Sequence, residues 1–426
     1  MSVVLILVFL GLALLGMPLA VAFGGASLVG LLMSSVDMSI FATRMAGSVN
    51  SFPLMAIPLF MLAGELMIAG GIMERLVALA NVVVGRVQGG LANATMVAGA
   101  GLASVSGVAV ADASALSATL VPPLKRVYGL GFASAVVAAS SNLGPIIPPS
   151  AAMIVYAFMA GSTVSVGALF MAGVVPGLLL TAGLIITTTL IVRIRGYEET
   201  SDRPGLADVV RELVRSLPVL LMPVIVIGGI VAGAFTATEG AAVAVVYAMV
   251  LGFFVTRELK PSDLPACLLG AAVTTSVVGA LIAFASTLTF LMTIDLLPMK
   301  LAAAVKDVTT DPLMFLLLVS AMLFVVGMFI ESNAAYIMLV PLFHPIAVAY
   351  GIDPTYFGFI FVFNLVIGML TPPVGVVLMV ICGVTNISMG ELMKHVWPYL
   401  LVMYGVLGLC IAFPPIVTTL PRMLGY

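Results

Sequence analysis

The residues best suited to hold ions or small polar groups lie in four short segments, where glycine and proline interrupt apolar sequence. The segments span residues 103–112, 140–150, 327–333 and 368–375. Glycine and proline break helical hydrogen bonding, which frees carbonyl oxygens and exposes helix N-termini. Hard cations prefer oxygen ligands, while a helix N-terminus offers N–H donors and a positive dipole end to an anion. Together the segments predict two cation sites with an anionic group bound between them.

The chain that must position these segments is strongly apolar. Of its 426 residues, 62% are hydrophobic and 8% are charged, whereas soluble proteins carry roughly 25% charged residues. Bilayer-spanning helices need about 20 apolar residues, and such runs recur from end to end without the alternation of barrel strands. Because lipid leaves no solvent for unpaired backbone groups, we predict an all-α polytopic membrane protein. No basic stripe typical of nucleic-acid binding is present.

Nine crossings are predicted from the apolar runs. They are residues 3–32, 53–69, 132–160, 167–192, 217–235, 241–256, 264–290, 356–384 and 396–416. Pro-Pro pairs interrupt the third and eighth crossings, which we expect to be broken helices. Two further regions, 91–124 and 313–343, have small or polar centres and are predicted to be re-entrant helical hairpins. The amphipathic stretches before them, 72–87 and 299–308, are either arms between a moving and a fixed domain or ordinary interfacial helices.

Basic residues predict the orientation. The polar stretch 193–216 carries five arginines, and the positive-inside rule places it in the cytoplasm. Counting crossings from that stretch puts twelve Lys and Arg residues inside and leaves four outside, which are Arg44, Lys300, Lys306 and Arg422. This split predicts an inside N-terminus, an outside C-terminus and a cytoplasmic connecting loop over 196–216. Asp295 is expected at the outer surface.

An internal repeat links the two halves of the chain. Six landmarks recur in order at a nearly constant offset of about half the chain, among them the Pro-Pro pairs at 148–149 and 372–373. Five crossings, an odd number, separate the two hairpin regions, so parity inverts the second copy. We therefore predict inverted repeats over 1–195 and 217–426. Inverted repeats with broken helices are typical of secondary transporters, which bind substrate and ions near the bilayer midplane.

Four motifs together resemble one transporter family. They are Ser51 to Glu65, the Ser-x-Ser-Gly and Ala-Asp of the first hairpin, Asn142 to Pro145 with its Pro-Pro pair, and Thr371 to Gly375. The whole chain resembles the large membrane subunit of tripartite ATP-independent periplasmic (TRAP) transporters, the DctM family. The resemblance implies an elevator-type importer of an organic acid, coupled to sodium, in a bacterial inner membrane. It implies Na+ as coupling ion with no other cofactor, and two partners: a small four-helix membrane subunit and a periplasmic substrate-binding protein.

By that resemblance, cation-binding roles fall on one set of residues in each repeat. The first set is Ser104, Ser106, Asn142, Gly144 and Pro145. The second set is Ser332, Asn333, Asn364, Gly368 and Thr371. Acidic residues associated with the two sites are Asp112 and Glu331, and the substrate-binding region is carried onto Pro149, Ser150, Pro373 and Gly375. No transition metal is expected.

Other interpretations stay open. Small residues and prolines in membrane helices often serve close packing alone, and Asp112 or Glu331 could cap a half-helix instead of aiding a cation site. A stand-alone elevator-type sodium/carboxylate symporter, which needs no binding protein, is the alternative function. A membrane enzyme would show clustered histidines and carboxylates, whereas His344 and His395 lie far apart, so we predict that the chain is not an enzyme. A scaffold would not need two symmetric broken sites.

Overall fold

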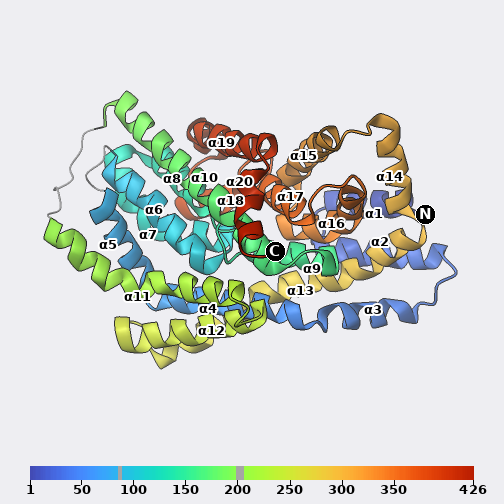
Figure 1. The fold of residues 1–426 in the computed structure, drawn as a ribbon, viewed down its shortest axis with the longest axis horizontal. Coiled ribbons are helices and arrows are strands. Elements are labelled where there is room, and N and C mark those ends of the chain that lie inside the picture. The colour runs from blue at the N-terminus through green and yellow to red at the C-terminus, as the bar shows by residue number, and fades with distance from the viewer. Residues whose placement is uncertain (85–88, 198–205) are drawn as a thin grey trace.

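The computed structural model describes residues 1–84, 89–197 and 206–426 (Figure 1), and every regular element within them is a helix. Eight of these helices are long and apolar enough to cross a membrane, which confirms the polytopic all-α prediction. The eight are Phe52–Ala69, Val166–Arg195, Val209–Val231, Ala237–Thr256, Pro261–Ile294, Pro312–Phe329, Ser332–Ala349 and Met389–Ala412. Arg86 and Arg203, which we counted among the inside basic residues, lie outside the described residues.

The N-terminal apolar segment is a helical hairpin. Helices α1 (Ser2–Leu14) and α2 (Leu19–Met33) pack against each other across a turn in which Gly16 has φ 82°. Pro18 precedes α2 and lacks the N–H that would continue α1. The prediction of one crossing over 3–32 is therefore wrong. The turn itself is apolar, so the hydrophobic run continues through it and hides the break.

The start of α1 lies beside the end of α13 (Leu264–Ile294). The Ser2 hydroxyl donates to Asp295 Oδ2 at 2.6 Å, and Lys300 Nζ lies 3.1 Å from Asp295 Oδ1. The N-terminus and Asp295 are therefore on the same side of the molecule. An inside N-terminus and an outside Asp295, both expected from the crossing count, cannot hold together.

Three helices lie lengthwise along α13. They are α3 (Ser39–Val49), the 3-10 turn η1 (Phe52–Met55) and α4 (Ala56–Ala69), and the first and last pack directly on α13 in the lower part of Figure 1. We did not predict α3, because its three hydroxyl-bearing residues and one arginine break the apolar run. Together these elements form a long layer beside the rest of the molecule.

Helices α11 (Leu206–Val231) and α12 (Ala237–Val250) extend this layer. Helix α12 packs on α4 and continues into a π-helical turn, η3 (Leu251–Thr256). Helix α11 begins at Leu206, so the second half of the predicted 196–216 loop is helical. A short 3-10 turn, η4 (Pro261–Asp263), leads into α13.

The two amphipathic stretches form helices at opposite ends of the long axis. Helix α5 (Ile72–Val84) stands at the left of Figure 1 and α14 (Leu297–Val308) at the right, each turned across the direction of α13. Helix α5 packs on α6 and α11, whereas α14 packs on α13 and α16. Each therefore joins the long layer to one helical hairpin.

Each hairpin is followed by a broken helix and a long helix. The first series is α6 (Gly90–Ser106), α7 (Ala109–Tyr128), α8 (Leu130–Ser141), α9 (Ala151–Ala160), η2 (Gly161–Thr163) and α10 (Val166–Arg195). The second is α15 (Pro312–Phe329), α16 (Ser332–Ala349), α17 (Pro354–Gly368), α18 (Val376–Thr385) and α19 (Met389–Ala412), with a terminal α20 (Pro415–Met423). Apart from η2 and α20, the two series have the same order of helices.

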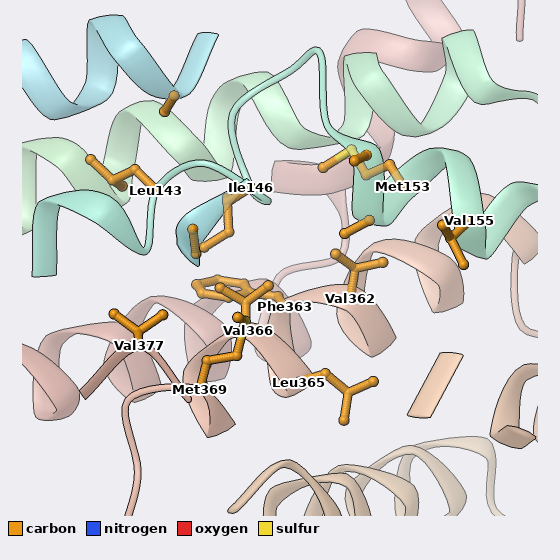
Figure 2. Packing of buried hydrophobic residues seen from close by; sticks show 14 of the residues in the cluster. Leu143, Ile146, Met153, Val155, Val362, Phe363, Leu365, Val366, Met369 and Val377 are labelled. Atoms are coloured by element: carbon orange, nitrogen blue, oxygen red, sulfur yellow. The ribbon is translucent and has the colours of Figure 1, made fainter. Parts of the chain in front are cut away.

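The two broken helices pack on each other at the centre of the molecule. Figure 2 shows Leu143, Ile146 and Met153 of the first facing Val362 and Val366 of the second, and all five are buried. Both Pro-Pro bonds in the breaks are cis. Lipid tails are as apolar as these side chains, so close packing and not the hydrophobic effect holds such helices together in a membrane.

Candidate ion sites at the hairpin tips

The tip of the first hairpin inserts into the break between α8 and α9. A Cβ on Gly107, at the tip, would lie 2.6 Å from the Pro149 carbonyl oxygen, and Gly107 has φ 63°. A Cβ on Gly144 would lie 2.7 Å from Asp112 Oδ2 and 3.2 Å from the Val108 nitrogen. A side chain at Gly107 would push the tip away from the break, whereas one at Gly144 would displace the Asp112 carboxylate.

Asp112 is the charged group of this first tip. It lies fully buried in the first turn of α7, and its Oδ1 accepts a short hydrogen bond from Ser106 Oγ. Its Oδ2, which faces Gly144, has no hydrogen-bond partner. A buried carboxylate oxygen without a donor is costly. The geometry therefore fits a cation beside Oδ2.

The neighbouring oxygens of the first site are already oriented. Ser150 Oγ donates to the Pro145 carbonyl at 2.7 Å and accepts from the Met153 nitrogen at 3.3 Å, which caps α9. Ser104 Oγ donates to the Gly101 carbonyl at 2.7 Å within α6. Ser104 Oγ, Ser150 Oγ and the Pro145 carbonyl oxygen each keep a lone pair after these bonds, so they can still approach a cation.

Asn142 has a different surrounding from the tip residues. Its Nδ2 donates to the Val366 carbonyl of α17 at 2.9 Å and lies 3.7 Å from the Met403 sulfur, while its Oδ1 is buried without a partner. The side chain therefore links the two broken helices. It joins elements that come from opposite halves of the chain.

Asn364, which the repeat pairs with Asn142, has different hydrogen-bond partners. Its Nδ2 donates to the Ile360 carbonyl at 2.9 Å and to Ser320 Oγ of α15 at 3.2 Å. When the two Pro-Pro pairs are matched, Asn142 corresponds to Val366, because two more residues separate Asn364 from its prolines. The two asparagine side chains therefore make different contacts in the two halves of the chain.

The tip of the second hairpin also meets its break through backbone atoms. The Val374 nitrogen donates to the Met328 carbonyl at 3.2 Å. A Cβ on Gly368 would lie 2.5 Å from the Gly327 Cα, so α15 and α17 touch where neither has a side chain. As at the first tip, glycine permits the close approach.

Glu331 caps the second tip. Its Oε2 accepts from the Ala334 nitrogen at 3.2 Å, and its Oε1 accepts from Asn333 Nδ2 at 2.9 Å and Ser332 Oγ at 3.3 Å. Both oxygens are satisfied by the start of α16, which is the helix-capping role. Asp112 differs, because one of its oxygens is left free.

Thr371 supplies the remaining hydroxyl of the second site. It is buried and donates to the Ile367 carbonyl at 3.0 Å, and its own carbonyl lies 3.3 Å from the position of a Cβ on Gly375. Tyr404 of α19 faces Thr371, but its buried hydroxyl makes no hydrogen bond of ordinary geometry. Sequence reasoning missed Tyr404, because a single tyrosine in an apolar helix carries no signal. Pro373 lies in the same link, between α17 and α18.

Transition-metal binding has no geometric support in the described part of the chain. No three His, Cys, Asp or Glu side chains of those residues gather in one place. Each tip has a single acidic side chain and a set of hydroxyl and carbonyl oxygens. Oxygen ligands with little net charge suit a monovalent cation better than Zn²⁺, which prefers nitrogen and sulfur.

Comparison with known proteins finds similarity along nearly the whole chain. The family model of the DctM component of tripartite ATP-independent periplasmic transporters matches residues 6–416. The sialic acid TRAP transporter large permease protein SiaM of Vibrio cholerae is 36% identical over 98% of this chain and 98% of its own length. The 2,3-diketo-L-gulonate large permease protein YiaN of Escherichia coli is 36% identical over 97% and 98%.

Two further comparisons add a relative and a fold. The C4-dicarboxylate TRAP transporter large permease protein DctM of Pseudomonas aeruginosa is 36% identical over 93% of this chain and 92% of its own length. The crystal structure of the Alcanivorax borkumensis YdaH transporter, described as having an unusual topology, superposes with a TM-score of 0.67 over 97% of this chain and all of that one. At 16% identity this structure shows a shared fold alone.

Proposed function

The chain belongs to the DctM family as the large membrane subunit of a TRAP transporter, and from that premise we propose that it imports an organic acid anion together with sodium ions. The relatives are named for sialic acid, 2,3-diketo-L-gulonate and C4-dicarboxylates. Each of these compounds carries a carboxylate, which supports an anionic substrate. The partners we propose are a small four-helix membrane subunit and a periplasmic substrate-binding protein.

One observation carries the sodium proposal. Asp112 has a buried, unpartnered oxygen at the first tip, beside the backbone of the break. An ionisable group at membrane depth is expensive unless a partner compensates it. Sodium would satisfy Oδ2 together with Ser106 and the carbonyls near Gly144. A second ion would lie with Ser332, Thr371 and the carbonyls of the second break, which lack a free carboxylate.

The substrate would then bind between the two tips. Helices α9 and α18 begin just beyond the breaks, and their N-termini offer N–H donors and a positive dipole end. Ser150 and Gly375 directly precede them and, with Pro149 and Pro373, form the proposed substrate-binding region. An anion there would be held by N–H groups and by the two cations, so its binding would depend on sodium.

An elevator motion follows from the division of the molecule. We propose that the hairpins and broken helices move as one body against the layer of α3, α4, α11, α12 and α13. Helices α5 and α14 would be the connecting arms. Their positions at opposite ends of the long axis support an inverted relation of the two repeats (Figure 1). The region of 193–216 would face the cytoplasm and the C-terminus the periplasm.

The test is uptake into proteoliposomes that contain the chain, its small subunit and the binding protein, with succinate and sialic acid as probes. We expect uptake to require an inward sodium gradient and to stop when potassium replaces sodium. Gly144→Ala should raise the half-saturating sodium concentration about tenfold, because the new methyl group displaces Asp112 Oδ2. Gly405→Ala, where a Cβ meets nothing within 4 Å, is the matched control.

Two outcomes would contradict the proposal. Uptake that is unchanged when potassium replaces sodium would contradict the proposed coupling to sodium. Robust sodium-driven uptake by this chain alone would instead indicate a stand-alone symporter of the same fold.

A further inference from the structure

A cavity of about 250 Å³ lies between the long layer and the second hairpin. One wall comes from α3 and α13 and carries the hydroxyls of Ser48, Ser286 and Thr289. The opposite wall comes from α9 and α16 and includes Phe158 and Ile337. Because Ile337 lies in the second turn of α16, the cavity approaches the second tip. It therefore lies on the boundary across which the proposed motion takes place.

Arg44 lies one helical turn away from this cavity. Its guanidinium carbon is 4.0 Å from the centre of the Phe290 ring of α13. Arg44 precedes Ser48 by four residues on α3, and Phe290 follows Ser286 by four on α13. Residues four apart lie on one face of a helix, a turn from each other. The Arg44–Phe290 contact thus lies one helical turn from Ser48 and Ser286, which line the cavity.

The charge of Arg44 is not balanced by an acidic side chain. None of the ion pairs found among the described residues includes it, whereas Lys300 pairs with Asp295 and Arg422 with Asp353. Arg44 is exposed, and stacking on a ring leaves the N–H edge of the guanidinium free. That edge is suited to a carboxylate, which it can bind through two parallel hydrogen bonds.

Two of the three cavity hydroxyls, those of Ser48 and Ser286, already donate their protons within the protein. Ser48 Oγ donates to the Met45 carbonyl at 3.0 Å, and Ser286 Oγ donates to the Ala283 carbonyl at 2.7 Å. Their protons are directed at their own helices. None of the side chains that line the cavity is charged, so a charge preference of the cavity would come from Arg44 beside it.

We propose that the cavity and Arg44 form a vestibule that holds a soluble organic anion by its carboxylate before it reaches the hairpin tips. The inference rests on the proposed import of an organic anion. Arg44 and the hydroxyl wall belong to the fixed layer, while α9 and α16 belong to the moving body. The anion would therefore bind to the fixed layer, next to the helices that move, and apart from the ion sites at the tips.

The test measures the charge preference of the cavity without any transport. The full chain, with its three native cysteines replaced by serine and Ser48→Cys introduced, is reconstituted in phosphatidylcholine vesicles. The new thiol is then modified with an anionic and a cationic methanethiosulfonate of similar size, and the ratio of the two rates is recorded. Adding Arg44→Gln should lower the anionic-to-cationic ratio about fivefold or more. At low salt the Arg44 charge, one helical turn from the thiol, attracts the anionic reagent and repels the cationic one.

Matched variants and salt make the result specific. Lys306→Gln removes an exposed charge of α14 and should leave the ratio unchanged, while Arg44→Lys should retain most of it. In the protein that keeps Arg44, raising the salt from about 0.01 M to about 1 M should lower the ratio, since the Debye length falls from about 30 Å to about 3 Å. This measurement remains available if Arg44→Gln does not fold.

Three results would overturn the vestibule. The first is an unchanged ratio with Arg44→Gln, and the second is that neither reagent reaches the thiol introduced in the cavity. The third is that adding phosphatidylglycerol to the vesicles lowers the ratio only in the protein that keeps Arg44. The last result would mean that a lipid phosphate occupies the guanidinium. Because the assay needs no sodium gradient, failure of the vestibule and failure of the proposed import can be told apart.

Discussion

At the scale of residues, the two hairpin tips differ in how they treat their carboxylates. Glu331 receives three hydrogen bonds from the start of α16, whereas Asp112 receives one and keeps an oxygen free. The same residue class therefore serves as a cap at one tip and as a candidate ligand at the other. The two proposed ion sites should respond differently to the loss of charge.

Replacement of Asp112 tests this difference. Asp112→Asn keeps the shape but removes the charge, and it should raise the half-saturating sodium concentration for uptake by about tenfold or more, since a hydrogen bond or contact to a charged group is worth about 1.5–3 kcal/mol. Glu331→Gln is the control. It should change sodium dependence less than about threefold and lower the thermal unfolding midpoint, because it weakens a helix cap worth about 1 kcal/mol. Equal sodium shifts in the two variants would contradict the assigned roles.

At the scale of elements, backbone contacts hold each hairpin to its broken helix. Gly327 and Gly368 let α15 touch α17, and Gly107 and Gly144 let the first tip enter its break. Asn142 then ties the two broken helices to each other. Each hairpin and its broken helix should therefore behave as one unit.

Substitution at the α15–α17 contact tests this unit. Gly368→Ala places a methyl group against backbone that cannot retract, so we expect a destabilisation of about 1–3 kcal/mol and a lower unfolding midpoint in detergent. Gly383→Ala on α18, where a Cβ meets nothing within 4 Å, should leave the midpoint unchanged or slightly raised. If Gly368→Ala unfolds at the same midpoint as the unsubstituted protein, α15 and α17 can separate without loss of stability.

The contact between α1 and Asp295 predicts a pH dependence. Hydrogen bonds from Ser2 and Lys300 hold the pKa of Asp295 well below its ordinary value. A depressed pKa means that the contact stabilises the folded protein fully above about pH 4, the usual value for aspartate, and loses that contribution as the pH falls further. The protection of α1 against proteolysis, and its hydrogen-exchange protection relative to the intrinsic exchange rate at each pH, should therefore fall in acid. Asp295→Asn should show the lower, acid level of protection already at neutral pH, and unchanged protection in that variant would contradict a stabilising role of the contact.

At the scale of the whole molecule, the sequence predicted the breaks better than the connections. Hairpins and broken helices were predictable because glycine and proline act locally, and the breaks at 142–150 and 369–375 lie inside the ranges expected. The turn between α1 and α2 was not, because its residues are apolar and no Lys or Arg occurs before Arg44, so the charge count is silent there. The Asn142–Val366 bond and the position of Tyr404 depend on packing between distant segments, which spacing does not encode.

The corrected N-terminal hairpin changes the expected orientation. If Asp295 lies outside, as the crossing count expects, the start of α1 lies outside as well, because the two are in contact. In a cysteine-free chain in intact spheroplasts, Val3→Cys, an exposed position, should react with a membrane-impermeant maleimide, whereas Lys260→Cys should react only after the membrane is opened. Labelling of Lys260→Cys alone from outside would reverse the whole topology.

The glycines at the two tips also limit how the sequence can diverge during evolution. At four positions even one added methyl group would collide with backbone or with Asp112, whereas the surfaces of α1, α11 and α13 expose many interchangeable apolar side chains. Selection on this chain therefore leaves little freedom at the tip glycines and wide freedom on these exposed outer faces. Related transporters with other substrates or in other membranes should therefore differ mainly at their lipid-facing surfaces. They should keep glycine at the four tip positions.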